Sequence, residues 1–103
     1  MAIMVVLFNL KPGVTPEQYE QWARDTDVPA VNALDAVERF RVYKSIGLLG
    51  TDAKPPYEYM ELVEIADLEQ LAQDAATERM REITAQFQTM ADNPIWILLD
   101  QFA

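Results

Sequence analysis

Four apolar stretches of the chain have the length and the β-branched and aromatic composition of strands. Turn residues separate them: Lys11-Pro12-Gly13 ends the first, and Asn93-Pro94 precedes the last. Between the second and the third, residues 49–56 contain turn-forming glycine and proline, and we expect them to form a loop that acts as a lid. The pattern predicts β-strands at residues 2–9, 37–48, 57–65 and 95–102.

The first long interval between these strands has helical spacing. Thr15 and Gln18 have the arrangement of a capping box, and Pro16 suits the first position of a helix. Pro29 is expected to disturb this helix near Val28, so that it frays or re-forms before residue 34. Its buried face is predicted to carry Tyr19, Trp22, Ala23 and Thr26.

The second long interval is also helical and is expected in two pieces. Asp67 and Gln70 have a capping arrangement, and Thr77 is placed to cap a second segment. Asn93-Pro94 is expected to end that segment. The inward faces are predicted to carry Leu68, Leu71, Ala72 and Ala75 in the first piece, and Met80, Ile83, Thr84, Phe87 and Met90 in the second.

The order of these elements predicts an α+β fold of the ferredoxin-like βαββαβ kind, with a four-stranded antiparallel sheet. The length of 103 residues is near the usual size of one domain, so residues 1–103 are interpreted as a single unit. A hydrophobic fraction of 50% and a charged fraction of 24% fit a folded, soluble chain.

Both faces of the first and last strands are apolar. In the first strand, the odd positions 3, 5 and 7 and the even positions 4, 6 and 8 all carry apolar side chains, and residues 95–99 repeat this arrangement. Two helices cover a four-stranded sheet on one face only. We therefore expect a homodimer through the open sheet face, as in a dimeric α/β-barrel. The alternative is that the helices cover the sheet less regularly and that its strands are merely rich in aliphatic residues.

Charge and cysteine content limit the partners and the compartment. The net charge of −9 repels phosphate backbones and anionic lipids, and the eight basic residues form no long run. Nucleic acid and membrane surfaces are therefore not expected as partners. The sequence has no cysteine, so nothing ties it to an oxidising compartment, and we expect a cytoplasmic location.

The residue types that are absent narrow the chemistry. Without histidine and cysteine, the chain cannot form a His-based triad, a thiolate nucleophile, an ordinary zinc site or a histidine-ligated haem. Its three glycines form neither a dinucleotide-binding nor a P-loop motif, and its acidic pairs lack the pattern of a calcium loop. No cofactor and no metal are expected. Carboxylates and phenols remain as acid–base groups.

Asp27 is the first candidate catalytic residue because it lies one helical turn after Ala23, on the rim of the predicted buried face. Partial burial would raise the pKa of its carboxyl group toward neutrality, as general acid–base catalysis requires. The alternative is that Asp27 caps the backbone before Pro29. Candidate contacts with a planar substrate, each with core packing or turn formation as the alternative, are Tyr19, Trp22 and Asn32.

The second and third strands supply further candidates. Arg39, Arg41 and Tyr43 share one face of the second strand, where Tyr43 is a candidate catalytic residue and Arg41 a candidate contact for an anionic or carbonyl group. The alternative is cross-strand pairing of the arginines with Glu58, Glu61 or Glu64. Tyr59, on the same face of its strand as Glu61, belongs either to the substrate pocket or to the dimer interface.

Two segments of the chain, residues 22–34 (WARDTDVPAVNAL) and 37–42 (VERFRV), resemble the RedY-like HapK family of the dimeric α/β-barrel superfamily. The resemblance covers nearly the whole chain, and the run from Asp27 to Asn32 is its most specific part. It implies cofactor-free chemistry, such as cyclisation, on a pyrrole- or indole-derived intermediate of bacterial pigment pathways. In the wider EthD-like group a histidine often stands two residues before the proline, and this sequence has Asp27 there.

Three functions remain open. The first is a cofactor-independent enzyme of secondary metabolism, with Asp27 as the acid or base and with Trp22, Tyr19 and Tyr43 shaping a pocket for a small aromatic or heteroaromatic metabolite. The second is a non-catalytic binding protein for a hydrophobic intermediate. The third is a cofactor-free monooxygenase, which shares the expected architecture.

Overall fold

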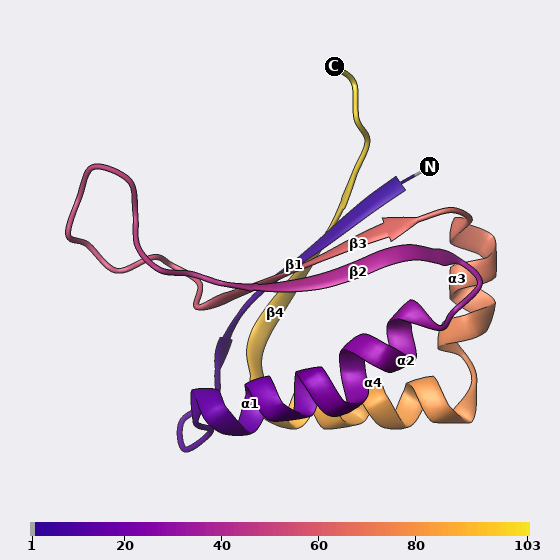
Figure 1. Cartoon of the computed structure of the whole chain (residues 1–103), viewed down its shortest axis with the longest axis horizontal. Coiled ribbons are helices and arrows are strands. Elements are labelled where there is room, and N and C mark those ends of the chain that lie inside the picture. Colours follow the sequence, from indigo (N-terminus) through magenta and orange to yellow (C-terminus); the bar gives the residue numbers. More distant parts are fainter. Residues whose placement is uncertain (1) are drawn as a thin grey trace.

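The computed structural model describes residues 2–103 and has the predicted α+β architecture (Figure 1). Its four antiparallel strands form one sheet in the order β2-β3-β1-β4. The strands are β1 (Ala2–Leu10), β2 (Val37–Lys44), β3 (Tyr59–Ile65) and β4 (Ala91–Leu99). The predicted βαββαβ order and four-stranded antiparallel sheet are confirmed.

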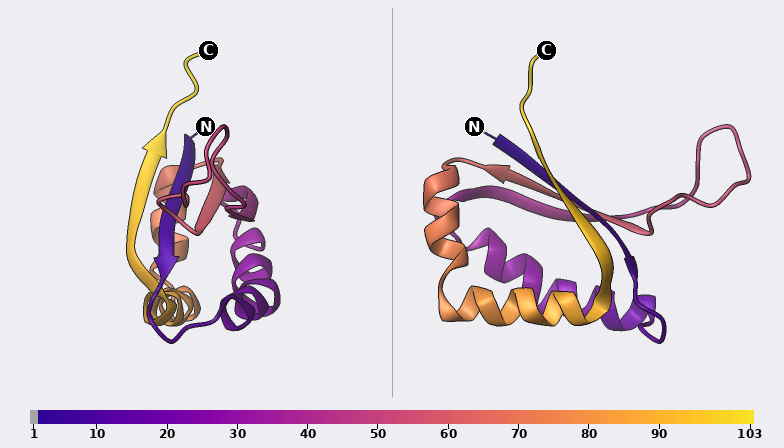
Figure 2. Two further views of the ribbon diagram at one scale, coloured as in Figure 1. Left: turned by 90° about the vertical axis from the view of Figure 1, so that its left-hand side faces the viewer. Right: turned by 180° about the vertical axis from the view of Figure 1, so that it is seen from behind.

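The helices lie on one side of the sheet (Figures 1 and 2). The segment between β1 and β2 is a continuous helical run of α1 (Pro16–Trp22), a π-helical turn (Ala23–Asp27) and α2 (Val28–Asn32). The segment between β3 and β4 contains α3 (Leu68–Ala75) and α4 (Glu78–Met90). Among the described residues, no helix has both the length and the apolar character needed to cross a membrane.

The helix starts are those that the sequence predicts. The Thr15 hydroxyl accepts a hydrogen bond from the backbone N–H of Gln18 at 3.2 Å, and the Gln18 side chain accepts one from the Thr15 N–H at 2.9 Å. Asp67 caps α3, and Thr77 caps α4. These caps satisfy backbone donors that have no partner within the helix.

Pro29 widens the first helical run without ending it. A proline has no N–H for the carbonyl four residues earlier, and its ring pushes against that carbonyl. The N–H of Val28 instead donates to the carbonyl of Ala23, five residues earlier, which creates the π-helical turn. Ala23 and Asp27 are both buried. The turn therefore directs Asp27 toward the sheet.

The hairpin between β2 and β3 is longer than the sequence predicts. The last strand pair is Lys44 with Tyr59, whereas the predicted strands continued to residue 48 and began at residue 57. Pro55 and Pro56 lack the N–H groups that a longer ladder needs. Residues 45–58 form an arm that projects from the body of the molecule (Figure 1).

Strand β4 begins directly after α4, four residues before its predicted start, and it ends at Leu99. Asn93-Pro94 therefore lies inside the strand and does not end the helix. The pairs Leu7 with Ile95 and Asn9 with Asp92 leave two residues of β4 opposite one of β1, which is a β-bulge. Asn93 has a φ of 45° there, a backbone conformation that asparagine tolerates better than most residues.

The two faces of the sheet differ in how they are covered. On the helix side, the core forms two clusters, one around Phe8, Tyr19 and Phe87 and one around Phe40 and Val63. On the opposite side, Ile95, Ile97 and Leu99 of β4 are 42%, 37% and 44% exposed. The predicted bare apolar face is therefore present in the single chain.

Candidate functional site

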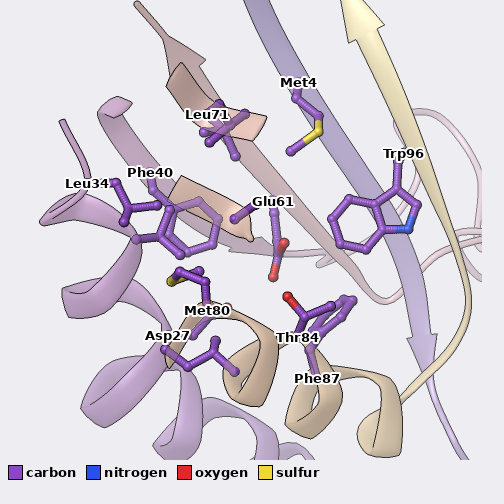
Figure 3. Close-up of a pocket in the computed structure, with 14 residues that line it drawn as sticks. Met4, Asp27, Leu34, Phe40, Glu61, Leu71, Met80, Thr84, Phe87 and Trp96 are labelled. Atoms are coloured by element: carbon purple, nitrogen blue, oxygen red, sulfur yellow. The ribbon is translucent and has the colours of Figure 1, made fainter. Parts of the chain in front are cut away.

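A cavity of about 150 Å³ lies between the sheet and the helices, where the two core clusters meet (Figure 3). A cavity of that size accommodates one aromatic ring. Its wall is mainly apolar and includes Met4, Leu34, Phe40, Met80, Phe87 and Trp96. The polar side chains that line it are Asp27, Glu61 and Thr84.

Asp27 enters this cavity from the π-helical turn. Its side chain is 5% exposed and makes no capping hydrogen bond at the start of α2. The capping alternative is therefore not what the structure has. The extra residue in the turn, which Pro29 favours, sets the direction of the carboxyl group.

Glu61 enters the cavity from β3 and is 4% exposed. It stands between Tyr59 and Val63 on the side of the strand that faces the helices, because side chains alternate along a strand. Figure 3 shows its carboxyl group extending into the space between the sheet and α4. The hydroxyl of Tyr19 donates a hydrogen bond to Glu61 Oε2 at 3.3 Å.

The carboxyl groups of Asp27 and Glu61 line the same cavity and interact electrostatically. Burial raises the pKa of Asp27 to about 6, and the interaction with Glu61 partly opposes that rise. Burial, followed by repulsion from Asp27, raises the pKa of Glu61 well above its usual value. Two carboxyl groups this close titrate as a pair. The pair therefore holds one proton near neutral pH, with Glu61 as the favoured carrier.

A half-ionised carboxyl pair in an apolar cavity can both donate and accept a proton. In such a pair Glu61 is the group that can donate a proton and Asp27 the group that can accept one, because the pKa values of both are raised above their usual range. Within residues 2–103, no three His, Cys, Asp or Glu side chains are grouped as metal ligands.

Tyr19 and Trp22 are candidate substrate contacts, but neither lines the cavity. Tyr19 is fully buried and reaches the cavity only through its hydrogen bond to Glu61. The Trp22 ring stacks on Phe87 with centroids 6.4 Å apart, and its Nε1–H donates to Gln86 at 2.6 Å. Tyr19 thus holds Glu61, and Trp22 packs against Phe87 of the cavity wall.

Tyr59 is buried, but its hydroxyl points to a different polar group. It donates to Glu20 Oε2 at 2.7 Å, and Lys44 and Arg24 form ion pairs with Glu20 at 3.2 and 3.4 Å. The hydrogen bond from Tyr59, followed by those cations, lowers the pKa of Glu20 below its usual value, although burial opposes this. Tyr59 is absent from the cavity lining and lies in a groove beside the edge strand β2.

Asn32 binds the backbone of β2. Its side-chain oxygen accepts from the Phe40 N–H at 2.8 Å, and its side-chain nitrogen donates to the Phe40 carbonyl at 3.1 Å and the Val28 carbonyl at 3.0 Å. The amide thereby takes the place of a neighbouring strand along the free edge of β2. These hydrogen bonds give Asn32 a structural role, and Asn32 does not line the cavity.

The structure does not bring Arg41 and Tyr43 to Asp27. Phe40 faces the helices, so its neighbour Arg41 and then Tyr43 face the opposite, open side of the sheet. Arg41 forms an ion pair with Glu64 at 3.3 Å, and its guanidinium lies over the Tyr43 ring at 5.9 Å. Tyr43, predicted as a catalytic residue beside Asp27, therefore does not line the cavity that Asp27 enters. The cross-strand alternative holds for Arg41 with Glu64.

Residues 49–56, the loop predicted to act as a lid, lie in the projecting arm (Figure 1) and contribute nothing to the lining of this cavity. Sequence reasoning considers Glu61 for cross-strand pairing or, with Tyr59, for the substrate pocket or the dimer interface, and it misses Glu61 as a candidate acid or base. One signal was available: in Tyr59, Glu61, Val63 and Ile65, Glu61 is the only charged side chain at alternate positions of an otherwise apolar face.

Three solved structures similar in fold have 24% or lower sequence identity. HapK from Hahella chejuensis is 24% identical, with a TM-score of 0.81 over 99% of this chain and 93% of that one. A dimeric ferredoxin-like protein from Thermobifida fusca is 18% identical, with a TM-score of 0.75 over 97% and 90%. SnoaB from Streptomyces nogalater, a cofactor-independent oxygenase, is 10% identical, with a TM-score of 0.77 over 99% and 93%.

These similarities support the ferredoxin-like fold. Comparison of the sequence with curated proteins finds no significant match. The sequence model of the family described as REDY-like protein HapK matches residues 2–102. That match spans nearly the whole chain, so the protein belongs to the REDY-like HapK family.

Proposed function

We propose that this protein is a cytoplasmic, cofactor-independent enzyme of secondary metabolism that performs acid–base chemistry, such as ring formation, on a small pyrrole- or indole-like metabolite. The substrate occupies the cavity between the sheet and the helices. Asp27 and Glu61 exchange protons with it, and Tyr19 positions Glu61. Membership of the HapK family supports the metabolic setting.

One observation carries this proposal: a buried pair of carboxyl groups opens onto an apolar cavity large enough for one aromatic ring. A pair buried for stability alone would be a poor choice, because apolar residues of similar volume usually serve at least as well. The cavity provides space for a substrate next to the two carboxyl groups. Its mainly apolar wall also strengthens electrostatic effects on a bound molecule.

The experiment is a turnover assay with a panel of formylpyrroles, bipyrroles and bisindoles, followed by mass spectrometry of the products. We expect Asp27→Asn and Glu61→Gln each to lower turnover by about 100-fold or more, the usual contribution of a general acid or base. Asp25→Asn is the matched control, since Asp25 is on the same helical turn but exposed. Unchanged turnover in Asp27→Asn would refute the assigned roles.

The same assay distinguishes the alternatives. The similarity to SnoaB favours a cofactor-free monooxygenase as the second candidate, and that activity would consume oxygen and stop under nitrogen. A binding protein would retain the compound tightly and return it unaltered. Acid–base chemistry alone would proceed equally with and without oxygen.

We propose further that two copies of the chain pair through the open sheet face. The apolar face of β4 continues across β1 and β3 as the partly exposed Leu7 and Leu62, with the buried Val5 between them and Ile97. An apolar face of this kind is unusual in a soluble monomer. The relative from Thermobifida fusca is described as dimeric, which supports this arrangement. Sedimentation equilibrium at micromolar concentration tests it.

A further inference from the structure

We infer that the cavity selects ligands that carry a positively charged, planar nitrogen group, such as an amidinium, an iminium or a protonated heteroaromatic base, with Asp27 and Glu61 as the counter-ion. This inference rests on the proposed function, since it names the charge class of the substrate at the same site. Its basis is the charge of the groups around the cavity and the chemistry of the cavity wall.

The carboxyl pair has no cationic partner within residues 2–103. No lysine or arginine lines the cavity. Arg24 and Lys44 are held by Glu20 beside the edge strand, and Arg41 pairs with Glu64 on the opposite face of the sheet. Among the described side chains, only the Tyr19 hydroxyl donates a hydrogen bond to the pair, and it reaches only Glu61.

A buried carboxylate that lacks a counter-ion is unfavourable, and the protein limits that cost by keeping a proton on the pair. A cation in the cavity would remove the need for that proton. Both carboxyl groups could then be ionised, and each could accept a hydrogen bond from an N–H of the ligand. A planar group with two N–H donors fits two adjacent carboxyl groups because the bonds can be made in parallel.

The wall of the cavity suits the same ligand class. Phe40 and Trp96 lie on opposite sides of Glu61 in Figure 3, and Phe87 meets the Trp96 ring edge-on with centroids 5.7 Å apart. Aromatic faces attract cations as well as planar rings. Trp96 is 48% exposed, so part of its ring is free of protein contacts. The polarisable thioethers of Met4 and Met80 complete the wall.

Binding has a defined proton balance. The free pair carries one shared proton, and a ligand cation that binds to it displaces that proton to solvent. An anionic ligand would instead require the pair to take up a second proton. The groups that face the pair do not change this balance near neutral pH: burial raises the pKa of Tyr19 far above that range, and Thr84, Met4, Phe40 and Trp96 do not titrate.

The test uses three ligands of nearly the same shape: benzamidine as the cation, benzamide as the neutral compound and benzoate as the anion. Calorimetry and the NMR shift of the Trp96 indole N–H follow binding to the full-length wild-type protein at pH 8. We expect benzamidine to bind at least 10-fold more tightly than benzamide, and benzoate to bind most weakly. The affinity for benzamidine should rise from pH 5 to pH 8, with release of close to one proton measured from the dependence of the heat on the buffer.

Two variants test whether Asp27 and Glu61 cause the preference for benzamidine. The double change Asp27→Asn with Glu61→Gln should remove the preference for benzamidine, whereas Asp25→Asn should keep it. Because the wild-type comparison needs no variant, a misfolded double variant leaves the test intact. Benzamide binding as tightly as benzamidine at pH 8 would overturn the charge selection.

The outcomes also separate this inference from the proposed function. If neutral formylpyrroles bind and are converted while benzamidine does not bind, the charge selection is wrong and the proposed function stands. If neither the benzamidine series nor the pyrrole and indole panel binds, both fail.

Discussion

Tyr19 and Glu61 connect the first helix to the centre of the sheet through a hydrogen bond inside the core. The phenolic O–H donates to Oε2 at 3.3 Å, and both side chains are buried. Glu61 is also next to Asp27, so Tyr19 favours the ionised form of one member of the pair. The bond links the packing of α1 to the proton affinity of the site.

Tyr19→Phe should therefore raise the pKa of Glu61 further, because the hydrogen bond from Tyr19 lowers it. The phenyl ring keeps the edge contact with Phe8, so the cost in folding free energy should be only about 1 kcal/mol. NMR titration of carbon-13-labelled glutamate carboxyl groups measures the change. Tyr59→Phe is the matched control, since its hydroxyl serves Glu20. Identical Glu61 titrations in wild type and Tyr19→Phe would contradict the role of the hydrogen bond.

The carboxyl pair should make the protein less stable as the pH rises above about 4 and passes the raised pKa values. The folded-state pKa of Asp27, about 6, exceeds the ordinary value of 3.8, and that of Glu61 is raised as well. The folded state thus binds protons more tightly than the unfolded chain. This contribution is fully present below about pH 4 and is lost as the pH passes the raised values, at about 1.4 kcal/mol for each pKa unit.

Asp27→Asn removes that penalty at high pH. We expect the variant to be more stable than wild type at pH 8, by on the order of 2 kcal/mol, and to lose the advantage near pH 4. Urea denaturation at several pH values gives the difference directly. Asp25→Asn, whose carboxyl group is exposed, should show no such pH-dependent difference. A constant offset between Asp27→Asn and wild type from pH 4 to pH 8 would rule out the ionised buried carboxyl as its cause.

The sequence was a good guide where a single local rule decides the outcome. Thr15, Asp67 and Thr77 cap helices as their spacing indicates, and the two-sided apolar character of β4 correctly indicated an uncovered sheet face. Boundaries were less accurate where two rules competed. At Asn93-Pro94 the proline suggested a helix end, but an edge strand tolerates a proline at a bulge, and β4 starts earlier.

The site was only half predictable for a similar reason. Helical spacing placed Asp27 on the buried face, but its partner Glu61 comes from a strand that lies 34 positions later. Only the assembled sheet shows which face of β3 meets the helices. The position of Tyr43 was missed for the same reason. Alternation along β2 correctly places Arg41 and Tyr43 on one face, but it does not show that the helices cover the other face.

Asn32 provides a test of a structural role against a ligand-binding role. Asn32→Ala removes three hydrogen bonds to the Val28 carbonyl and the Phe40 backbone and leaves the free edge of β2 without its partner. Because the side chain is partly solvated, we expect a loss of about 1–2 kcal/mol in the free energy of unfolding. The affinity for benzamidine at a temperature where both proteins are folded should not change. If Asn32→Ala lowered the affinity for benzamidine without changing the stability, Asn32 would have a ligand-binding role and not a structural one.

Ile97 tests the proposed pairing of two sheets. It lies opposite Val5 on the open face, within the edge strand β4, and 37% of it is exposed in the single chain. Ile97→Glu would bury a charge with no counter-ion between two apolar faces, so the dimer dissociation constant should rise by about 100-fold or more. Leu98→Glu is the matched control: Leu98 is the next residue, is also exposed, and faces the other side of the strand, so its change should leave the dimer intact. Sedimentation equilibrium across a concentration series measures both constants. If Ile97→Glu dimerises as tightly as wild type while Leu98→Glu dissociates, the partner binds on the helix side of β4, and the open face must be covered in another way.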